Sequence, residues 1–319
     1  MEEIIGIVAS LIAVIGGLYQ GYRWLRNKLD SKKTEITNGD DSLNESVANR
    51  FLKLFEAHGV YRNQIPEFFD HGLTISDVQT EDNLLNKLTP SLLQSAADLF
   101  QVNTEWLSHG QGEIFESHHF YKHPTEFGRY IDELQARGDD KLIEGFVLTV
   151  KPPRKHEEDT LILLKESIGV VGERTIFRYH LCPGWVLSYW KCCADVACCI
   201  SQAQMRDVYM VGKYVEKGWL ESFAEGVLLP SFSFELDELD MSIKGRWQAD
   251  EFVDTPEKFI APLSKEDGYS VASAIDRWLG YFEAGDIYIH SATTNKKIGV
   301  SFKRYADSYI SKKQYLNNS

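Results

Sequence analysis

The sequence predicts an α+β protein in which an N-terminal transmembrane helix precedes a small all-helical module and a larger domain of segregated helices and strands. Three observations predict this order. Residues 4–22 carry no charge, apolar side chains recur with helical spacing from residue 47, and runs of β-branched and aromatic residues begin at residue 145. With 319 residues and 43% apolar content, the chain is long enough to fill two cores.

The first 28 residues are expected to form a membrane anchor. The uncharged segment 4–22 would make a helix of roughly 28 Å, close to the ~30 Å hydrocarbon thickness of a bilayer. Its acidic start and the bulky residues after it argue against a secretory signal peptide. Because the basic residues follow the segment, the positive-inside rule predicts a single-pass protein of the bacterial inner membrane, with the bulk of the chain in the cytoplasm.

Small residues recur at every fourth position of this segment. Ala9, Ala13, Gly17 and Gly21 would lie on one helical face, where two backbones can approach closely. This pattern indicates a homo-oligomer, although small residues are also common in membrane helices that do not associate. Residues 29–46 are polar and are expected to form a flexible linker.

Residues 47–117 are expected to form a compact module of four or five short helices. The first helix would end at His58-Gly59, because glycine readily adopts the left-handed conformation that ends helices. Pro90 would occupy the favoured first position of a later helix. The other helices are expected at 61–69 and at about 80–88, within a segment 75–88.

The end of this module resembles a known family. Residues 95–112 read Ser-Ala-Ala-Asp-Leu-Phe-Gln-Val-Asn-Thr-Glu-Trp-Leu-Ser-His-Gly-Gln-Gly, which is similar to the close of the helix-turn-helix domain of the Cro and phage-repressor family. The resemblance covers residues 47–115 and implies that the helix near 75–88 reads the major groove of DNA. It implies DNA-contacting roles for Arg62, Asn63, Gln64, Asn83 and Lys87.

Charge favours a different partner for the module. Eleven acidic residues and four basic ones lie between Glu45 and Glu116, so the module repels phosphate. The whole chain carries a formal net charge of −13. Pro66 also departs from the family, because proline removes a backbone donor within the expected second helix. The module is therefore predicted to bind either DNA or a protein, with the fold alone unable to decide.

Residues 118–319 are expected to form an α+β sensory or effector domain. Helices are predicted at 120–137, 202–210, 216–225 and 269–282, and strands at 145–150, 160–164, 169–181, 286–290 and 298–302. Trp185, Tyr189 and Trp190 are candidates to line a pocket for a small-molecule ligand, since aromatic side chains often do so.

Five cysteines between Cys182 and Cys199 are the strongest candidates for chemistry. They could ligate a metal, but no Cys-x-x-Cys spacing occurs, and buried small hydrophobes are the favoured interpretation. His118, His119 and His123 are interpreted as part of an exposed connector. No familiar catalytic motif is found, so we predict no catalytic residue, metal or cofactor.

The sequence thus predicts a membrane-tethered regulatory or sensory protein that contains a repressor-like module and acts in transcription or signalling. The alternative is a membrane-anchored effector or enzyme whose metal- or thiol-dependent activity lies in the α+β domain.

Overall fold

The computed structural model describes residues 45–138, 141–151, 158–229, 243–263, 268–289 and 292–317. The chain divides into two compact units, Met1–Ser46 and Val47–Ser319. The expected anchor 1–28, its small-residue face and nearly all of the linker lie outside the described residues. Among the described helices, none combines the length and the apolar character needed to cross a membrane.

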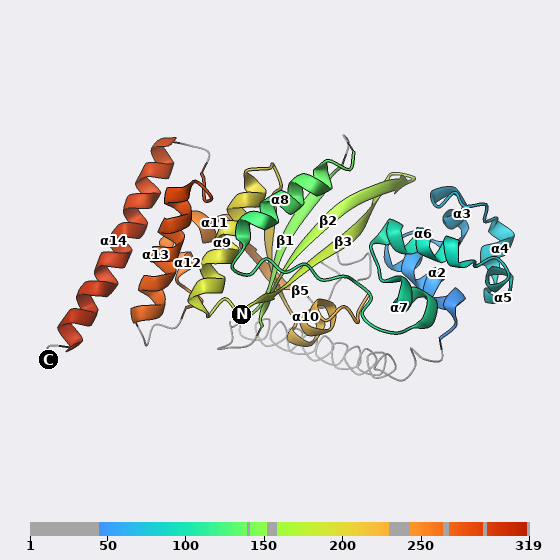
Figure 1. Ribbon diagram of the computed structural model, residues 1–319, viewed down its shortest axis with the longest axis horizontal. Helices are drawn as coiled ribbons and strands as arrows, with labels where there is room; N and C mark the ends of the chain where they lie inside the picture. Colours follow the sequence, from blue (N-terminus) through green and yellow to red (C-terminus); the bar gives the residue numbers. More distant parts are fainter. Residues whose placement is uncertain are drawn as a thin grey trace, which may run out of the picture. The chain divides into compact units, whose positions relative to one another are not determined.

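The second unit contains both helices and a five-stranded sheet, which confirms the α+β class (Figure 1). The strands are β1 (Ile143–Val150), β2 (Thr160–Val171), β3 (Arg174–Trp185), β4 (Met210–Val215) and β5 (Ile243–Gln248). Their order is β3-β2-β1-β4-β5, and β1 and β4 run parallel while the other neighbours run antiparallel. A parallel pair needs a crossover, and helix α9 (Trp190–Gln204) lies between β3 and β4 in the chain.

Short helices precede the sheet, and their ends follow from local chemistry. The Thr89 hydroxyl accepts from the Leu92 N–H at 3.2 Å and Pro90 takes the first helical position, so α6 begins there. The same helix ends at Gln101, which adopts the left-handed conformation. The helices are α2 (Val47–Ala57), the 3-10 turn η1 (Arg62–Gln64), α3 (Ile65–Phe68), α4 (Ile75–Gln79), α5 (Glu81–Leu85), α6 (Pro90–Phe100) and α7 (Thr104–His109).

One face of the sheet shares a single core with these helices and with α10 (Lys217–Ala224). Phe146 and Leu148 of β1 belong to the same buried cluster as Phe55 and Phe100 of the helices. His58 stacks between the two parts, with its ring centroid 4.3 Å from that of Phe100 and 5.3 Å from that of Tyr179 on β3. These helices therefore bury the face of the sheet that carries Phe146 and Leu148.

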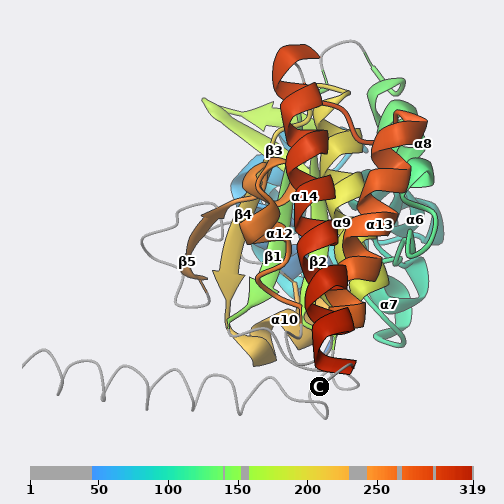
Figure 2. The same ribbon diagram turned by 90° about the vertical axis from the view of Figure 1, so that its left-hand side faces the viewer.

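The opposite face is covered by α8 (Pro124–Gln135) and α9, which pack against each other. Helix α13 (Gly268–Ala284) packs on α9, and α14 (Ala292–Asn317) packs on α13, as Figure 2 shows. The short helices α11 (Glu251–Asp254) and α12 (Pro256–Phe259) complete this side. Trp278 of α13 stacks on Phe302 of α14 with ring centroids 3.7 Å apart, which fixes the two helices against each other.

A buried carboxylate ties the helical layers together. Asp195 of α9 accepts from Arg277 Nε at 2.6 Å and from the Tyr281 hydroxyl at 2.8 Å, both on α13. Its second oxygen accepts from the Lys122 N–H at 2.9 Å in the segment before α8. The charge of Asp195 is thus paired and hydrogen-bonded, as burial of a carboxylate requires.

Several elements differ from the sequence expectations. The expected strands 286–290 and 298–302 are wrong, because α14 spans the second and no strand forms in the described part of the first. The expected helix 202–210 is also wrong, since α9 ends at Gln204 and β4 starts at Met210. Residues 190–204 are apolar nearly all round and buried, so they show no helical periodicity that would separate a buried helix from a strand.

Candidate functional site

The structure places the predicted DNA-contacting side chains on the module, where four of them make polar contacts within the chain. Arg62 pairs with Glu56 at 2.9 Å, and Lys87 pairs with Asp77 at 3.7 Å. Gln64 accepts a hydrogen bond from the Tyr61 N–H at 3.0 Å, and Asn83 donates one to the Ser76 carbonyl at 3.0 Å. Asn63 is exposed. The contacts of Gln64 and Asn83 cap and join short helices, so these side chains have local structural roles.

The segment expected to read the major groove is not one helix. Thr80 is extended, with φ −127° and ψ 153°, and separates α4 from α5. Its hydroxyl accepts from the Asn83 N–H at 3.2 Å, so Thr80 begins a new helix and does not continue the previous one. The reader near 75–88 that the resemblance implies is therefore two helices of five residues each, and the second of them, α5, lies within the helix expected at about 80–88.

Two large apolar side chains are exposed on these short helices. Ile75 at the start of α4 is 55% exposed and Leu85 at the end of α5 is 42% exposed. The acidic residues Asp77, Glu81 and Asp82 accompany them on the same two helices. Exposed apolar side chains with a charged surround are typical of a protein-binding surface.

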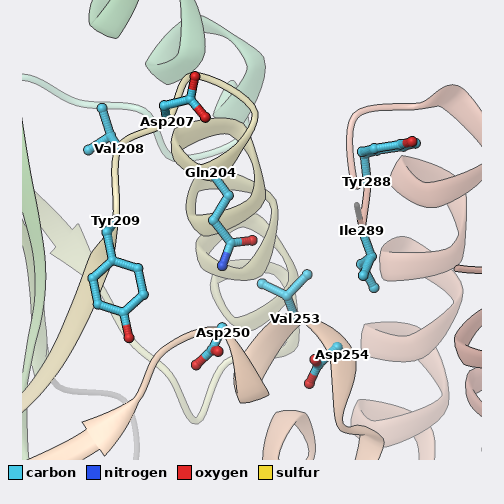
Figure 3. A pocket seen from close by; sticks show the side chains of 9 residues that line it. All are labelled: Gln204, Asp207, Val208, Tyr209, Asp250, Val253, Asp254, Tyr288 and Ile289. Atoms are coloured by element: carbon cyan, nitrogen blue, oxygen red, sulfur yellow. The ribbon is translucent and has the colours of Figure 1, made fainter. Parts of the chain in front are cut away.

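The three aromatic residues proposed for a ligand pocket have different surroundings. Trp185 is fully buried, and its indole Nε1 donates to the Cys182 carbonyl at 2.8 Å. Tyr189 and Trp190 are partly buried against the core at the start of α9. Two cavities are present among the described residues, one at the C-terminal end of α9 around Gln204 and Asp254 (Figure 3) and one beside α10 around His119 and Lys217, and none of the three aromatic residues lines either of them.

All five cysteines are buried and free of disulfides. Cys192, Cys193, Cys198 and Cys199 lie on α9. Burial raises the pKa of the Cys192 thiol to about 11 and raises the pKa of Cys193 and Cys199 well above the ordinary value. No metal-binding arrangement of three His, Cys, Asp or Glu side chains exists among the described residues.

A buried charge cluster that the sequence did not reveal lies at the join between the helical module and the sheet. Glu166 of β2 is fully buried, and Arg178 of β3 donates to both of its oxygens at 2.8 and 2.7 Å. Arg137 donates to the same carboxylate at 3.3 Å, and Lys141 Nζ lies 3.8 Å from Glu166 Oε1. Burial alone would raise the pKa of Glu166, but hydrogen bonds from His180 and Arg178 outweigh it and lower the pKa to about 2.

A chain of hydrogen bonds leads from this carboxylate toward the surface. His180 Nε2 lies 2.9 Å from Glu166, and its Nδ1 lies 2.8 Å from the Tyr130 hydroxyl. That hydroxyl lies 2.9 Å from Nε2 of the half-buried His118. Burial lowers the pKa of His180, which favours the neutral ring. In the neutral tautomer that suits both contacts, Nε2 donates to the carboxylate and Nδ1 accepts from the tyrosine.

The cluster reaches the module through the guanidinium of Arg178. Its Nη1 donates to the carbonyls of Asp98 and Leu99, at 3.4 and 3.3 Å, in the last turn of α6. A cation is favourable at this end of a helix because the last carbonyls carry partial negative charge. Arg178 therefore joins the sheet to the module with one side chain.

Only part of this arrangement has a signal in the sequence. Arg178 and His180 alternate on one strand, which places them on one face of the sheet. Glu166 joins them because the antiparallel register pairs Glu166 with Arg178 and Leu164 with His180. That register and the approach of α8 depend on tertiary packing, which the sequence pattern does not give.

Comparison with known proteins finds no relative of this chain. No protein-family model matches the chain, and neither a curated protein nor a solved structure is significantly similar to it.

Proposed function

We propose that the chain is a membrane-tethered regulatory protein whose helical module, residues 47–117, binds a protein partner through the surface of α4 and α5. The observation that carries this proposal is the exposure of Ile75 and Leu85 on two adjoining short helices. The tether is the uncharged segment 4–22. The partner is expected to present an apolar contact with a basic rim, because the acidic residues Asp77, Glu81 and Asp82 lie on the same two helices.

The same region is a poor DNA reader. A recognition helix must present several side chains to base edges along the major groove, and neither five-residue helix provides that length. The two basic residues among the predicted DNA contacts, Arg62 and Lys87, are paired with Glu56 and Asp77. The excess of acidic residues between Glu45 and Glu116 opposes DNA further.

The join at Arg178 supports a regulatory function over an independent binding module. Arg178 donates hydrogen bonds both to Glu166 of the sheet and to carbonyls at the end of α6. A ligand or modification that moves these strands would therefore also change the hydrogen bonds to α6. The enzyme alternative relied on thiol or metal chemistry, and the thiols are buried with raised pKa values. The regulatory function is therefore the one that the geometry favours.

Site-specific photo-crosslinking in the native cells tests the proposal. A photoreactive amino acid at position 75 or 85 of the full chain should give one discrete protein adduct. The matched control is the same probe at Val300 of α14, which is 49% exposed and belongs to the opposite side of the sheet. The adduct should be absent there.

DNA binding is measured on the same full-length protein by fluorescence anisotropy across a salt series. Saturable, salt-sensitive binding that Lys87→Ala weakens and Ile75→Asp leaves unchanged would overturn the proposal in favour of DNA. Adducts that form equally at positions 75, 85 and 300 would overturn it as well.

A further inference from the structure

Helix α14 carries a charge opposite to that of the chain as a whole. Its sequence contains six lysine and arginine residues and one acidic residue, a net charge of +5, whereas the whole chain has a formal net charge of −13. The helix packs on α13 and α12, and Figures 1 and 2 show its other side facing away from the rest of the second unit. That other side is therefore open to a partner.

The open side of α14 is basic. At about 100° per residue, an arc of about 120° holds four exposed cations, which we call the basic face: Lys296, Lys297, Lys303 and Arg304. Val300, which is 49% exposed, lies within the same arc. Among the described side chains of the arc one is acidic, that of Asp307. The face extends over about 12 Å along the helix axis.

Most of this charge has no counter-charge within the described part of the chain. Lys303 pairs with Glu283 of α13 at 3.3 Å. The side chains of the other three cations form no ion pair or hydrogen bond with any described residue. By contrast, the exposed Arg129 of α8 pairs with Glu126 at 3.0 Å. The three unpaired cations are therefore available to an anion outside the chain.

The partner of such a face must present several anionic groups on an open surface. The cytoplasmic leaflet of a bilayer does so, because its anionic lipids attract each lysine or arginine held near them. An exposed apolar side chain such as Val300 adds a contact that helices lying on a membrane commonly use. A nucleic acid offers phosphates too, but the net charge of −13 on the whole chain repels a polyanion in solution.

We propose that the basic face of α14 docks on an anionic lipid bilayer, with its unpaired cations at the lipid phosphates and Val300 within the contact. This contact goes beyond the partner binding of α4 and α5. The choice of lipid over nucleic acid rests on the tether of the proposed function, since segment 4–22 would hold the chain at a membrane. The experiment therefore reads the contact at α14 separately from the tether.

A fluorophore attached to α14 of the full-length protein tests the contact. The five native cysteines are buried, so Val300→Cys provides one exposed thiol for labelling. The labelled chain is placed in nanodiscs of phosphatidylcholine, with or without phosphatidylglycerol, that contain a lipid with a quencher on its headgroup. Quenching should be strong in the anionic nanodiscs, weak in the neutral ones and reversed by about 0.5 M salt, because salt screens the attraction.

A label at a distant exposed position provides the control. Val170→Cys, which is 63% exposed near the end of β2, should give no quenching in either nanodisc. Co-purification of the chain with neutral nanodiscs reports the tether independently. Equal quenching at position 300 in neutral and anionic nanodiscs, or no quenching in anionic nanodiscs that retain the chain, would overturn the proposal.

Charge-neutral variants locate the contact. Lys296→Gln combined with Lys297→Gln should lower the ratio of lipid-bound to free label about tenfold or more, because each cation near an anionic membrane adds to the attraction. The matched control is Lys87→Gln combined with Arg129→Gln, which changes the net charge equally at exposed positions of other elements. It should leave the quenching unchanged. Equal losses in the two double variants would show that overall charge and not α14 governs the contact.

Nucleic acid is the competing anion. An RNA or DNA oligonucleotide is titrated into the same labelled protein in neutral nanodiscs and followed by fluorescence anisotropy. Saturable binding that the Lys296→Gln and Lys297→Gln pair abolishes, together with no quenching by anionic lipid, would assign the face to nucleic acid and overturn the proposal.

Discussion

Arg178 donates to both oxygens of Glu166, with Nε–Oε2 at 2.8 Å and Nη2–Oε1 at 2.7 Å, while its remaining Nη1 reaches the carbonyls at the end of α6. Bidentate pairing of this kind fixes both partners in geometry as well as in charge. Both side chains are largely removed from water, so replacing Glu166 leaves Arg178 without its counter-charge, whereas Glu166 would keep Arg137 and His180 if Arg178 were replaced.

Glu166→Gln should therefore lower the free energy of unfolding by about 3–5 kcal/mol, because it leaves the buried guanidinium of Arg178 without its counter-charge. Urea denaturation followed by circular dichroism measures the change. The matched control is Glu126→Gln, which breaks the solvent-exposed Glu126–Arg129 pair of α8 and should cost less than about 1 kcal/mol. Equal effects of the two variants would contradict the buried pairing.

His58 makes stability depend on pH. Its Nδ1 lies 2.7 Å from the Leu54 carbonyl, its buried Nε2 has no hydrogen-bond partner among the described residues, and burial lowers its pKa from 6.5 to about 4. The folded protein keeps this ring neutral, while the unfolded chain takes up a proton below pH 6.5. The contribution of His58 is therefore complete above pH 6.5 and is lost between pH 6.5 and about 4, by up to about 3 kcal/mol.

Urea midpoints across pH 4 to 8 check this dependence. His58→Gln should be less stable at pH 7, because it disturbs the packing against Phe100 and Tyr179, and its stability should fall less steeply toward pH 4. His109→Gln, at an exposed position of α7, serves as the control and should keep the wild-type slope. An unchanged slope in His58→Gln would show that other groups carry the acid sensitivity.

The cysteines should be inert in the folded protein. A thiolate is the reacting species, and burial raises the pKa of Cys192 to about 11 and that of Cys193 well above its usual value. Iodoacetamide at pH 8 should label no thiol of the native chain, and it should label all five in urea, as counted by intact mass. Met205→Cys, at a site that is 43% exposed, should add one native label. Rapid native labelling of α9 would show that this helix opens.

Local chemistry determines which helices the sequence predicts well. Residues 90–100 were expected to be helical because Thr89-Pro90 starts a helix by capping and by the preset φ of proline, and α6 begins there. The helix predicted at about 80–88 corresponds to α5, which Thr80 caps, but the continuous reader near 75–88 that the resemblance implies is divided there into two helices. Threonine within an amphipathic run permits either outcome, and packing against α2 decides.

The candidate sites were less accessible to sequence analysis than the helices. Glu166 and Arg178 are twelve residues apart on two strands, and only the hairpin register brings them face to face. The cavity at the end of α9 collects Asp207, Asp250 and Tyr288 from distant parts of the chain. No spacing rule covers such groups, because their proximity results from the β1–β4 crossover and the packing of α13.

The core that the helical module shares with the sheet limits how this chain can be divided. If residues 47–117 were removed, Phe146, Leu148, Leu163 and Leu181 would lose the helices that bury them together with α10, and apolar surface would be exposed to water. Such a fragment is expected to aggregate, so a deletion that abolishes activity would not by itself locate that activity in the module. The same core opposes exchange of the module between proteins as an independent cassette, since a recipient would need a sheet with the complementary apolar face.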